Sequence, residues 1–508
     1  MRGASSGDWR DLTILVTALT MAGILSGLVG AYTYVFVGLA VPTCVVAFRD
    51  SRFACVMVAI TSPLVAVGAV RIGFHLVPCY PVIVAGLAGA TRRREWHGLA
   101  WRLTDGLAVA FGLVALTVSA ATLGTAPKVD IPGAVGVNGR MLRSPAQLAA
   151  LLLMLGLYAL LRMSIRDRES LRAVARALLA AWAAVALYAA YQFIARSAML
   201  PYAYLNDRRT LSELPIGRMS VRINGTLPEA SPLAAFSFAA IACGVATLLR
   251  GQSGTRLMRP RAASVLTLAG FGILLASLSK AALVSAVLVL PALITRGRTW
   301  STKGRVAAAL MVAGVCGIVA VGLALRSPGI QLSSVVNSEL YVREGYWLAA
   351  LHIGAAHPFG VGVGNYTFYY PLYAPVSTSY EFLNGITDAH SWYLEAFAET
   401  GVVGGLLFLA FTLSVAISGL GISQRRSRPG DELVLAFGVA WTACALMHTT
   451  YSYFYYPFEW VFAGIVCAGR SISIRESALT EAEPPKEGEV DALLHAHELT
   501  TMKNVRSP

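Results

Sequence analysis

The chain has 508 residues, of which 56% are hydrophobic and only 13% charged, and its formal net charge is +14. Apolar stretches of roughly 17 to 22 residues recur along it, each long enough to cross a hydrocarbon core of about 30 Å. A soluble domain could not bury that much apolar surface. The composition therefore predicts an all-α, polytopic membrane protein of about 14 transmembrane helices. The positive charge is explained by topology and by anionic membrane lipids, so we expect no nucleic-acid partner.

The first apolar stretch has the length of a span and lacks an Ala-x-Ala cleavage site, so we interpret it as a retained helix and not as a signal peptide. The expected spans are 12–30, 32–48, 53–70, 72–90, 103–124, 146–161, 177–195, 232–249, 263–278, 280–295, 306–325, 400–420, 432–449 and 458–469. Residues 1–325 thus hold eleven helices and 400–470 hold three. The acidic segment 471–508 is typical of a disordered cytoplasmic tail.

The basic residues test this order of spans independently, because alternate connections should be rich in Lys and Arg if the count is right. The alternate connections are indeed basic. Of the 41 Lys and Arg, 29 fall on one side, which includes both termini, and 12 fall on the other. The first side is therefore predicted to be cytoplasmic. The seven cysteines show no paired short spacing, which argues against a zinc site or a disulfide framework.

Three segments on the predicted external side are too long for simple turns: 125–145, 196–231 and 326–399. Long loops in compact assemblies are usually functional. The last one is rich in tyrosine, which suits stacking on sugar rings but is more typical of the aromatic belt at a membrane interface. Its Gly360-x-Gly362-x-Gly364 run follows no strand, so it predicts turns with close backbone approach and not a nucleotide fingerprint.

Four motifs follow one another between about residues 220 and 420. They are Arg222-x-x-Gly225-Thr226, then Ser279-Lys280-Ala281, then Arg343-x-x-x-Trp347 with His357-Pro358-x-Gly360, and finally His390-Ser391-x-x-Leu394-Glu395-x-x-Ala398-Glu399-x-Gly401-x-x-Gly404. In this order they resemble the O-antigen ligase and O-antigen polymerase superfamily. The resemblance implies a polytopic glycosyltransferase that uses a polyprenyl-diphosphate-linked glycan as donor. It also implies a long external loop between two late helices. One departure is Lys280, where the family usually has arginine; lysine keeps the charge but loses the planar fork.

The resemblance implies that cationic side chains bind the diphosphate, whose negative charge grows as the glycosidic bond breaks. Arg222, Lys280 and Arg343 are the candidates, and Trp347 is assigned to substrate binding with them. The alternative is that these cations only reach toward lipid headgroups. No Asp-x-Asp motif or acidic cluster occurs on the external side, so we expect neither a metal nor a cofactor.

His390 is the candidate catalytic base, because an imidazole titrates near neutral pH and can take the proton of an acceptor hydroxyl. Asp388 and Glu395 could orient it or act in its place, and His390 could also be a structural histidine at a helix start. The expected partners are the lipid-linked donor, a glycan, lipid or other hydroxyl acceptor, and membrane lipids. Polymerase and ligase are not distinguished by these motifs.

A transporter or flippase of a lipid-linked sugar is the main alternative. Such proteins place ionisable groups near the middle of interrupted helices, whereas here the expected spans are nearly free of charge and the polar residues gather on one side. The pattern favours an enzyme of the bacterial cytoplasmic membrane whose active site faces the periplasm or the exterior.

Overall fold

The computed structural model describes residues 32–65, 70–71, 75–131, 139–198, 200, 223–249, 257–277, 279–296, 332–376, 378, 388–421, 431–452 and 455–482. Within these ranges the protein is helical, apart from one pair of two-residue antiparallel strands. The predicted helices 12–30 and 306–325, residue Arg222 and residues 483–508 of the predicted tail lie outside the described residues. The first part of that tail, 471–482, is not disordered but continues the last helix.

The helices follow the chain in this order: α2 (Tyr32–Arg49), α3 (Ser51–Thr61), α4 (Cys79–Arg92), the 3-10 helix η1 (Glu95–Gly98), α5 (Leu103–Ala121), α6 (Arg140–Ser164), α7 (Arg168–Ser197), α8 (Ala230–Leu249), α9 (Pro260–Ser277), α10 (Lys280–Arg296), α12 (Leu332–Ala356), α13 (Tyr366–Tyr373), α14 (Trp392–Leu420), α15 (Asp431–Met447) and α16 (Pro457–Ala482). The strands β1 (Val70–Arg71) and β2 (His75–Leu76) lie between α3 and α4.

Six of the described helices are long and apolar enough to cross a membrane: α5, α6, α7, α8, α9 and α14. The predicted class, a polytopic helical membrane protein, is therefore confirmed. Two expected spans are shorter than predicted. The first, expected over 53–70, ends at Thr61, because Pro63 has no N–H to continue the helix. The second, expected over 72–90, begins only at Cys79, after the strand pair.

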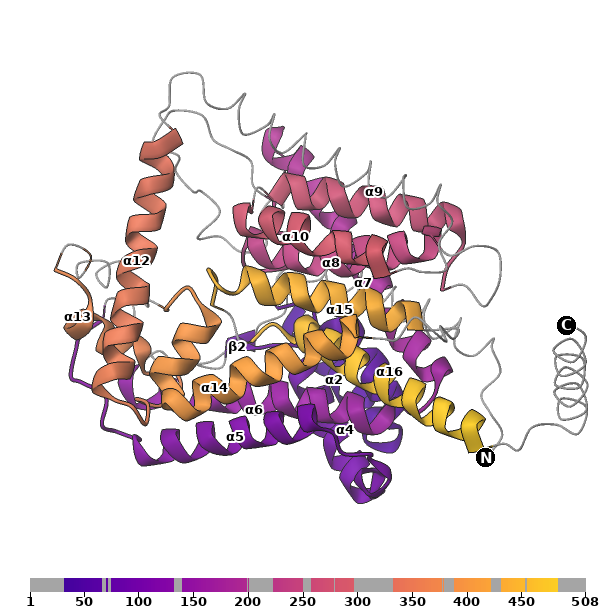
Figure 1. The fold of residues 1–508 in the computed structure, drawn as a ribbon, viewed down its shortest axis with the longest axis horizontal. Coiled ribbons are helices and arrows are strands. Elements are labelled where there is room, and N and C mark those ends of the chain that lie inside the picture. Colours follow the sequence, from indigo (N-terminus) through magenta and orange to yellow (C-terminus); the bar gives the residue numbers. More distant parts are fainter. Residues whose placement is uncertain are drawn as a thin grey trace, which may run out of the picture.

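Most helices run along the long direction of the molecule, and α12 stands across one end of this bundle with α13 beside it (Figure 1). Contacts tie α12 to α13 and α14, while α14 also packs on α5 and α15. The predicted external loop 326–399 is thus not structureless: within its described part it forms a 25-residue helix and an eight-residue helix. Apolar length does not reveal α12, since its sequence mixes serines, glutamates and arginine with apolar residues.

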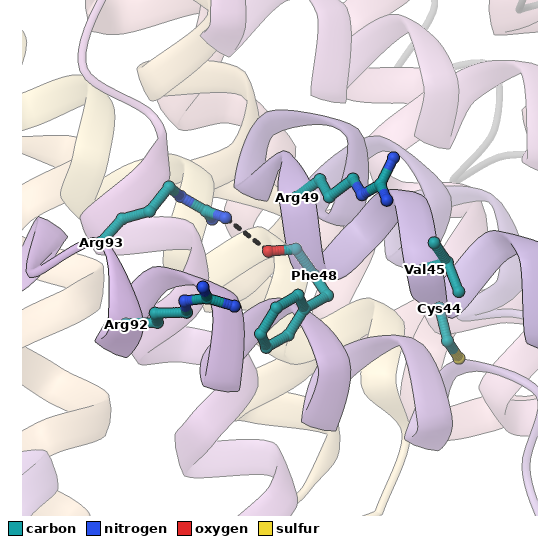
Figure 2. A pocket seen from close by; sticks show the side chains of 6 residues that line it. All are labelled: Cys44, Val45, Phe48, Arg49, Arg92 and Arg93. Atoms are coloured by element: carbon teal, nitrogen blue, oxygen red, sulfur yellow. Dashed lines mark hydrogen bonds between the residues drawn. The ribbon is translucent and has the colours of Figure 1, made fainter.

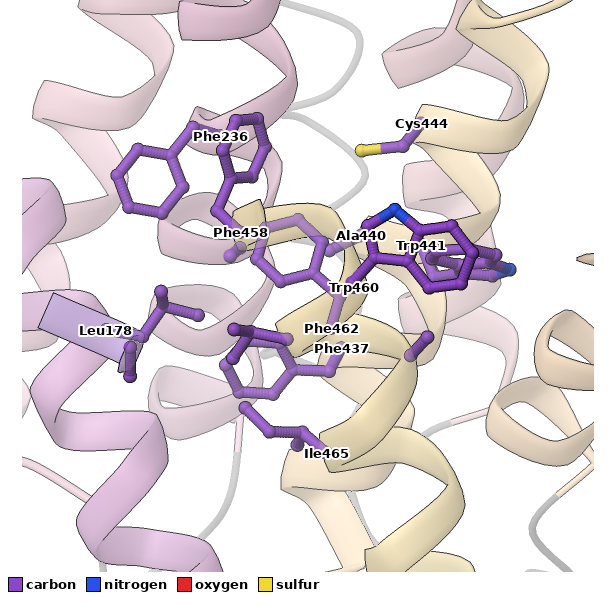
Figure 3. Packing of buried hydrophobic residues seen from close by; sticks show 14 of the residues in the cluster. Leu178, Phe236, Phe437, Ala440, Trp441, Cys444, Phe458, Trp460, Phe462 and Ile465 are labelled. Atoms are coloured by element: carbon purple, nitrogen blue, oxygen red, sulfur yellow. The ribbon is translucent and has the colours of Figure 1, made fainter. Parts of the chain in front are cut away.

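The interior is aromatic where α8, α15 and α16 meet (Figure 3). The ring of Phe236 lies 4.9 Å from that of Phe458, and Phe458 in turn lies 5.7 Å from Phe462. All three side chains are fully buried. Such ring pairs add to burial through their edge and face attraction, so this cluster fixes how α16 sits against α8.

A buried ion pair joins three helices at the end of the bundle opposite α12. Arg162 of α6 donates from Nε and Nη2 to the two carboxylate oxygens of Asp105 in α5, each at 2.8 Å, and its Nη1 reaches the backbone oxygen of Cys467 in α16. Tyr158 donates a further hydrogen bond to Asp105 at 2.7 Å. The two charges thus pair with each other and form further hydrogen bonds to neighbouring groups. This is the condition under which a buried ion pair is tolerated.

Candidate functional site

The segment that leads into α14 is held in place before the helix begins. The Ser391 side chain caps α14 by accepting a hydrogen bond from the backbone N–H of Leu394. The backbone N–H of Ser391 donates to Oγ of Ser452 at 2.6 Å, and that of Trp392 donates to the backbone oxygen of His448 at 3.0 Å. The start of α14 is therefore fixed to the connection between α15 and α16.

His390 lies immediately before this cap with φ 45°, a left-handed conformation that is uncommon for a residue other than glycine. Its backbone N–H donates to Oδ1 of Asp388 at 2.9 Å, and its ring Nε2 is 3.7 Å from the same oxygen. The ring stacks on Tyr346 at 5.0 Å between centroids and meets the edge of Tyr451 at 6.4 Å. Ring atom Nδ1 is buried and has no hydrogen-bond partner among the described residues.

One face of α12 supplies the neighbours of His390. Positions 343, 346 and 347 are separated by three and four residues, the spacing that places side chains on one side of a helix. Trp347 donates from its indole N–H to the backbone oxygen of His390 at 3.4 Å, and Arg343 donates to the backbone oxygen of Thr450 at 3.0 Å. The structure thus brings together four of the predicted site residues: Arg343, Trp347, Asp388 and His390.

The glycine run is explained by the bend at which α14 changes direction. Gly401 has φ 74° inside α14, and a Cβ added there would lie 2.4 Å from the backbone oxygen of Pro358. A Cβ on Gly360 would lie 2.5 Å from the backbone oxygen of Glu399, and the N–H of Gly362 donates to that oxygen at 2.8 Å. The predicted close backbone approach is confirmed, and it joins the end of α12 to the bend of α14.

Two carboxylates lie on the segment of α14 before this bend, four residues apart on one side of the helix. Glu395 and Glu399 are 8% and 2% exposed. Glu399 accepts a hydrogen bond from the backbone N–H of Tyr366 at 3.1 Å, whereas Oε2 of Glu395 has no hydrogen-bond partner among the described residues. Glu399 belongs to the recognised motif, but it was not predicted as a site residue. Its burial beside Glu395 is what singles it out.

Two of the four tyrosines of α13, Tyr366 and Tyr370, serve packing. Tyr366 and Tyr370 are 1% and 0% exposed and form a small core with Tyr346 and Ile353 of α12. Neither of the two roles considered from the sequence, sugar stacking or a membrane-interface belt, fits side chains buried in this way. They hold α12 against α13 instead.

A buried histidine–glutamate pair next to the start of α14 was not predicted from the sequence. Nε2 of His448 lies 2.8 Å from Oε2 of Glu459, and both side chains are 0% exposed. The His448 ring also stacks face to face on Trp392, with centroids 3.8 Å apart. The two residues are separated by eleven positions across a turn between apolar helices, and no local pattern in the sequence links them.

Lys280 lies at the first position of α10 and is exposed. The residue before it, Ser279, contacts Oγ of Ser231 at the start of α8 at 3.1 Å. Close by, Tyr451 donates a hydrogen bond to Glu229. Burial, and then the charge of Glu229, raise the pKa of Tyr451 well above its usual range, so this phenol stays protonated and can donate. The residue before Lys280 therefore contacts the start of α8, and the segment just before α8 is hydrogen-bonded to Tyr451 of the His390 site.

Arg222 lies outside the described residues, but the segment after it is described. The backbone N–H of Gly225, which has φ 60°, donates to Oε1 of Gln192 at 2.7 Å, and Thr226 donates to the backbone oxygen of Pro63 at 2.8 Å. This segment is therefore anchored between α7 and the end of α3. In the described part of the chain no three His, Cys, Asp or Glu side chains gather as metal ligands would, and independence of a metal stays a prediction.

Residues 263–409 match the O-antigen ligase family model. The match confirms the resemblance to the O-antigen ligase superfamily and supports a glycan-ligating or polymerising function in a membrane. It includes Lys280, Arg343, Trp347, His390 and both buried glutamates. No curated protein matches the chain.

Proposed function

We propose that this protein, whose residues 263–409 match the O-antigen ligase family, transfers or polymerises a glycan from a polyprenyl-diphosphate donor onto an acceptor hydroxyl at the external face of the cytoplasmic membrane. The observation that carries the proposal is the position of His390, a part-exposed imidazole immediately before α14. Around it lie Arg343, Asp388 and the ring of Tyr346.

In this proposal His390 takes the proton of the acceptor hydroxyl while that oxygen forms a bond to the anomeric carbon of the donor. The bond from that carbon to the diphosphate oxygen breaks, and the diphosphate leaves with the electron pair. Asp388 lies 3.7 Å from Nε2 and can orient the imidazole, and because Nδ1 is buried the proton is taken by Nε2 at the part-exposed edge of the ring. Direct attack of this kind inverts the anomeric centre.

Arg343 lies on the side of the site where the leaving group would sit in this scheme. Its only described hydrogen bond uses Nη1, which leaves the other N–H groups of the guanidinium for phosphate oxygens. A planar guanidinium binds phosphate through two parallel hydrogen bonds, so it stabilises the charge that develops on the diphosphate. Lys280 and Arg222 are further candidates for the same role. Trp347 fixes the backbone of His390 through its indole N–H.

The position of charged groups favours this enzyme over a transporter. Most buried ionisable groups described in the helices lie close to helix ends, namely Asp105, Arg162, Glu395, Asp431 and Glu459, while Glu399 lies two residues before the bend of α14 at Gly401. A transporter would be expected to hold such groups at the centre of interrupted helices. Charges that gather at two surfaces suit a reaction carried out at one of them.

The experiment is glycan transfer by the purified protein in lipid with a polyprenyl-diphosphate-linked donor, alongside donor binding. His390→Ala should lower transfer by about 10²–10⁴, the usual contribution of a positioned base, while donor binding survives. His390→Gln should be no better, since an amide cannot accept the proton. Substantial turnover by His390→Ala would reject the base, and loss of donor binding would make His390 a substrate ligand instead.

A further inference from the structure

A hollow of about 720 Å³ opens where α2 and α4 end side by side. It is lined by Cys44, Val45, Phe48, Arg49, Arg92 and Arg93 (Figure 2). The hollow is remote from His390. Helix α6 starts at the His390 end, where Arg143 donates to the backbone oxygen of Gly364, and just past its other end Arg166 donates to the backbone oxygen of Glu95. At 1.5 Å per residue the two ends are about 35 Å apart.

Of the three arginines, Arg49 and Arg92 have guanidinium N–H groups available to a ligand. Arg93 is engaged, since its Nε donates to Glu95 at 2.7 Å and its Nη1 donates to the backbone oxygen of Phe48. Arg92 lies over the Phe48 ring at 5.6 Å. In the described part of the chain neither Arg49 nor Arg92 makes a hydrogen bond or an ion pair, so their guanidinium groups can still bind an anion.

The charge balance around the hollow is positive. Three guanidinium groups are offset by the Glu95 carboxylate and by the two helix C-termini, each worth about half a negative charge. The neighbouring Asp50 is occupied as the cap of α3, where it accepts from the backbone N–H groups of Arg52 and Phe53. With the charge of Asp50 counted, and with about half a positive charge added by the N-terminus of α3, an excess of about half a positive charge remains at the rim.

An apolar strip continues from the hollow along α2. Val41, Val45 and Arg49 are each four residues apart and so lie on one face of the helix, and the two valines are 62% and 48% exposed. A ligand that bound Arg49 through a charged head could lay an apolar chain on these valines. That is the shape of a phospholipid in a leaflet, whose phosphate sits at the level where apolar helices end.

We propose that this hollow, formed by the ends of α2 and α4, binds one anionic phospholipid of the adjacent leaflet. Arg49 and Arg92 hold the phosphodiester through guanidinium hydrogen bonds, and Val41 and Val45 contact an acyl chain. Basic pockets between membrane helices are suited to such headgroups. The proposed lipid site does not depend on the glycan transfer proposed above. It predicts that the protein prefers anionic phospholipid in the leaflet at this end of the helices.

Cys44 offers a native reporter, because it lines the hollow and is the only described cysteine that is not buried. The full-length protein is placed in nanodiscs of phosphatidylcholine with or without phosphatidylglycerol, and the rate at which N-ethylmaleimide alkylates Cys44 is measured by peptide mass spectrometry. Phosphatidylglycerol should slow the reaction. In Arg49→Gln/Arg92→Gln the amount of phosphatidylglycerol needed for half protection should rise about 30-fold, the value expected for the loss of two surface arginines.

Arg94→Gln is the matched control, since Arg94 is adjacent in sequence but does not line the hollow. It should keep the protection of the native protein. Arg49→Lys/Arg92→Lys, which keeps the charge, should retain part of it and thus separates binding from misfolding. Equal protection in pure phosphatidylcholine, equal protection by inorganic phosphate alone, undiminished protection in the Gln pair, or an equal loss in Arg94→Gln would each overturn the proposal.

Discussion

Arg343 is the residue through which the proposed phosphate role can be tested most directly. Arg343→Ala removes a guanidinium aimed at the developing charge, so transfer should fall by at least about 100-fold, as for other losses of transition-state hydrogen bonds. Arg343→Lys keeps the charge but not the planar fork and should restore only part of the activity. The measurement is transfer with the lipid-linked donor, with the amount of inserted protein determined in parallel.

Arg140 provides a control for general loss of charge, because it also lies on the predicted external side and its described hydrogen bond is to the backbone oxygen of Ala126, away from His390. Arg140→Ala should leave transfer close to native. Near-native transfer by Arg343→Ala would exclude the phosphate role, even if Arg140→Ala behaved as expected.

We expect the pair His448 and Glu459 to position the candidate base. It supports Trp392, two residues from His390, through a ring stack and a backbone hydrogen bond. Glu459→Ala leaves a buried polar ring without its partner and should lower the free energy of unfolding by about 1–3 kcal/mol. Because the donor site is untouched, kcat should fall while KM stays nearly constant.

Glu459→Gln separates positioning from charge, since the amide can keep a hydrogen bond to Nε2 of His448 at similar geometry. It should recover much of the kcat that Glu459→Ala loses. A fall in kcat that is as large for the glutamine variant, or a rise in KM alone, would show that the pair does not act by placing His390.

At this scale the sequence identified four residues that do lie together, because the helical spacing of Arg343 and Trp347 and the short segment from Asp388 to His390 are local. It could not identify Glu459, Tyr451 or Ser452. They reach the site only because α15 and α16 fold back upon α14, and pairing across helices leaves no periodic signal in one sequence.

Among the elements, α14 depends most on a single residue. Gly401→Ala would place a Cβ 2.4 Å from the backbone oxygen of Pro358 at φ 74°, so backbone strain and steric crowding act together. Their sum should reduce the free energy of unfolding by about 2–5 kcal/mol. Thermal unfolding in detergent would report the loss, and transfer should fall as well because the turn before α13 moves away from the bend of α14.

Gly106→Ala is the matched substitution in a helix without this constraint. No atom lies within 4 Å of a Cβ added at Gly106, and the residue is in the first turns of α5. Alanine there should be neutral or stabilising by about 0.5–1 kcal/mol. Similar melting temperatures for the two variants would mean that the bend at Gly401 is not required.

The sequence located most apolar helices well, since length and hydrophobicity determine them. It missed α12, because a helix that crosses the end of a bundle need not be apolar along its whole length. It also extended two early spans over residues that form a strand pair, because Val70 and the residues around it are apolar enough for a span although Pro63 has already ended the helix.

For the molecule as a whole, the decisive question is which end faces outward. The predicted orientation rests on the distribution of Lys and Arg, and it places Phe359 and Val376 outside and Leu479 in the cytoplasm. All three side chains are well exposed, at 83%, 92% and 64%. A cysteine introduced at any of them should therefore react if a reagent can reach it.

With a membrane-impermeant maleimide on intact cells whose outer permeability barrier, where one exists, has been opened, Phe359→Cys and Val376→Cys should be labelled and Leu479→Cys should not. After the cytoplasmic membrane is permeabilised, Leu479→Cys should be labelled too, which shows that its thiol is accessible. Native cysteines do not obscure the result if each variant is compared with the parent protein. Labelling of Leu479→Cys in intact cells together with protection at Phe359→Cys would reverse the orientation. His390 would then face the cytoplasm, and the proposed transfer at the external face could not occur there.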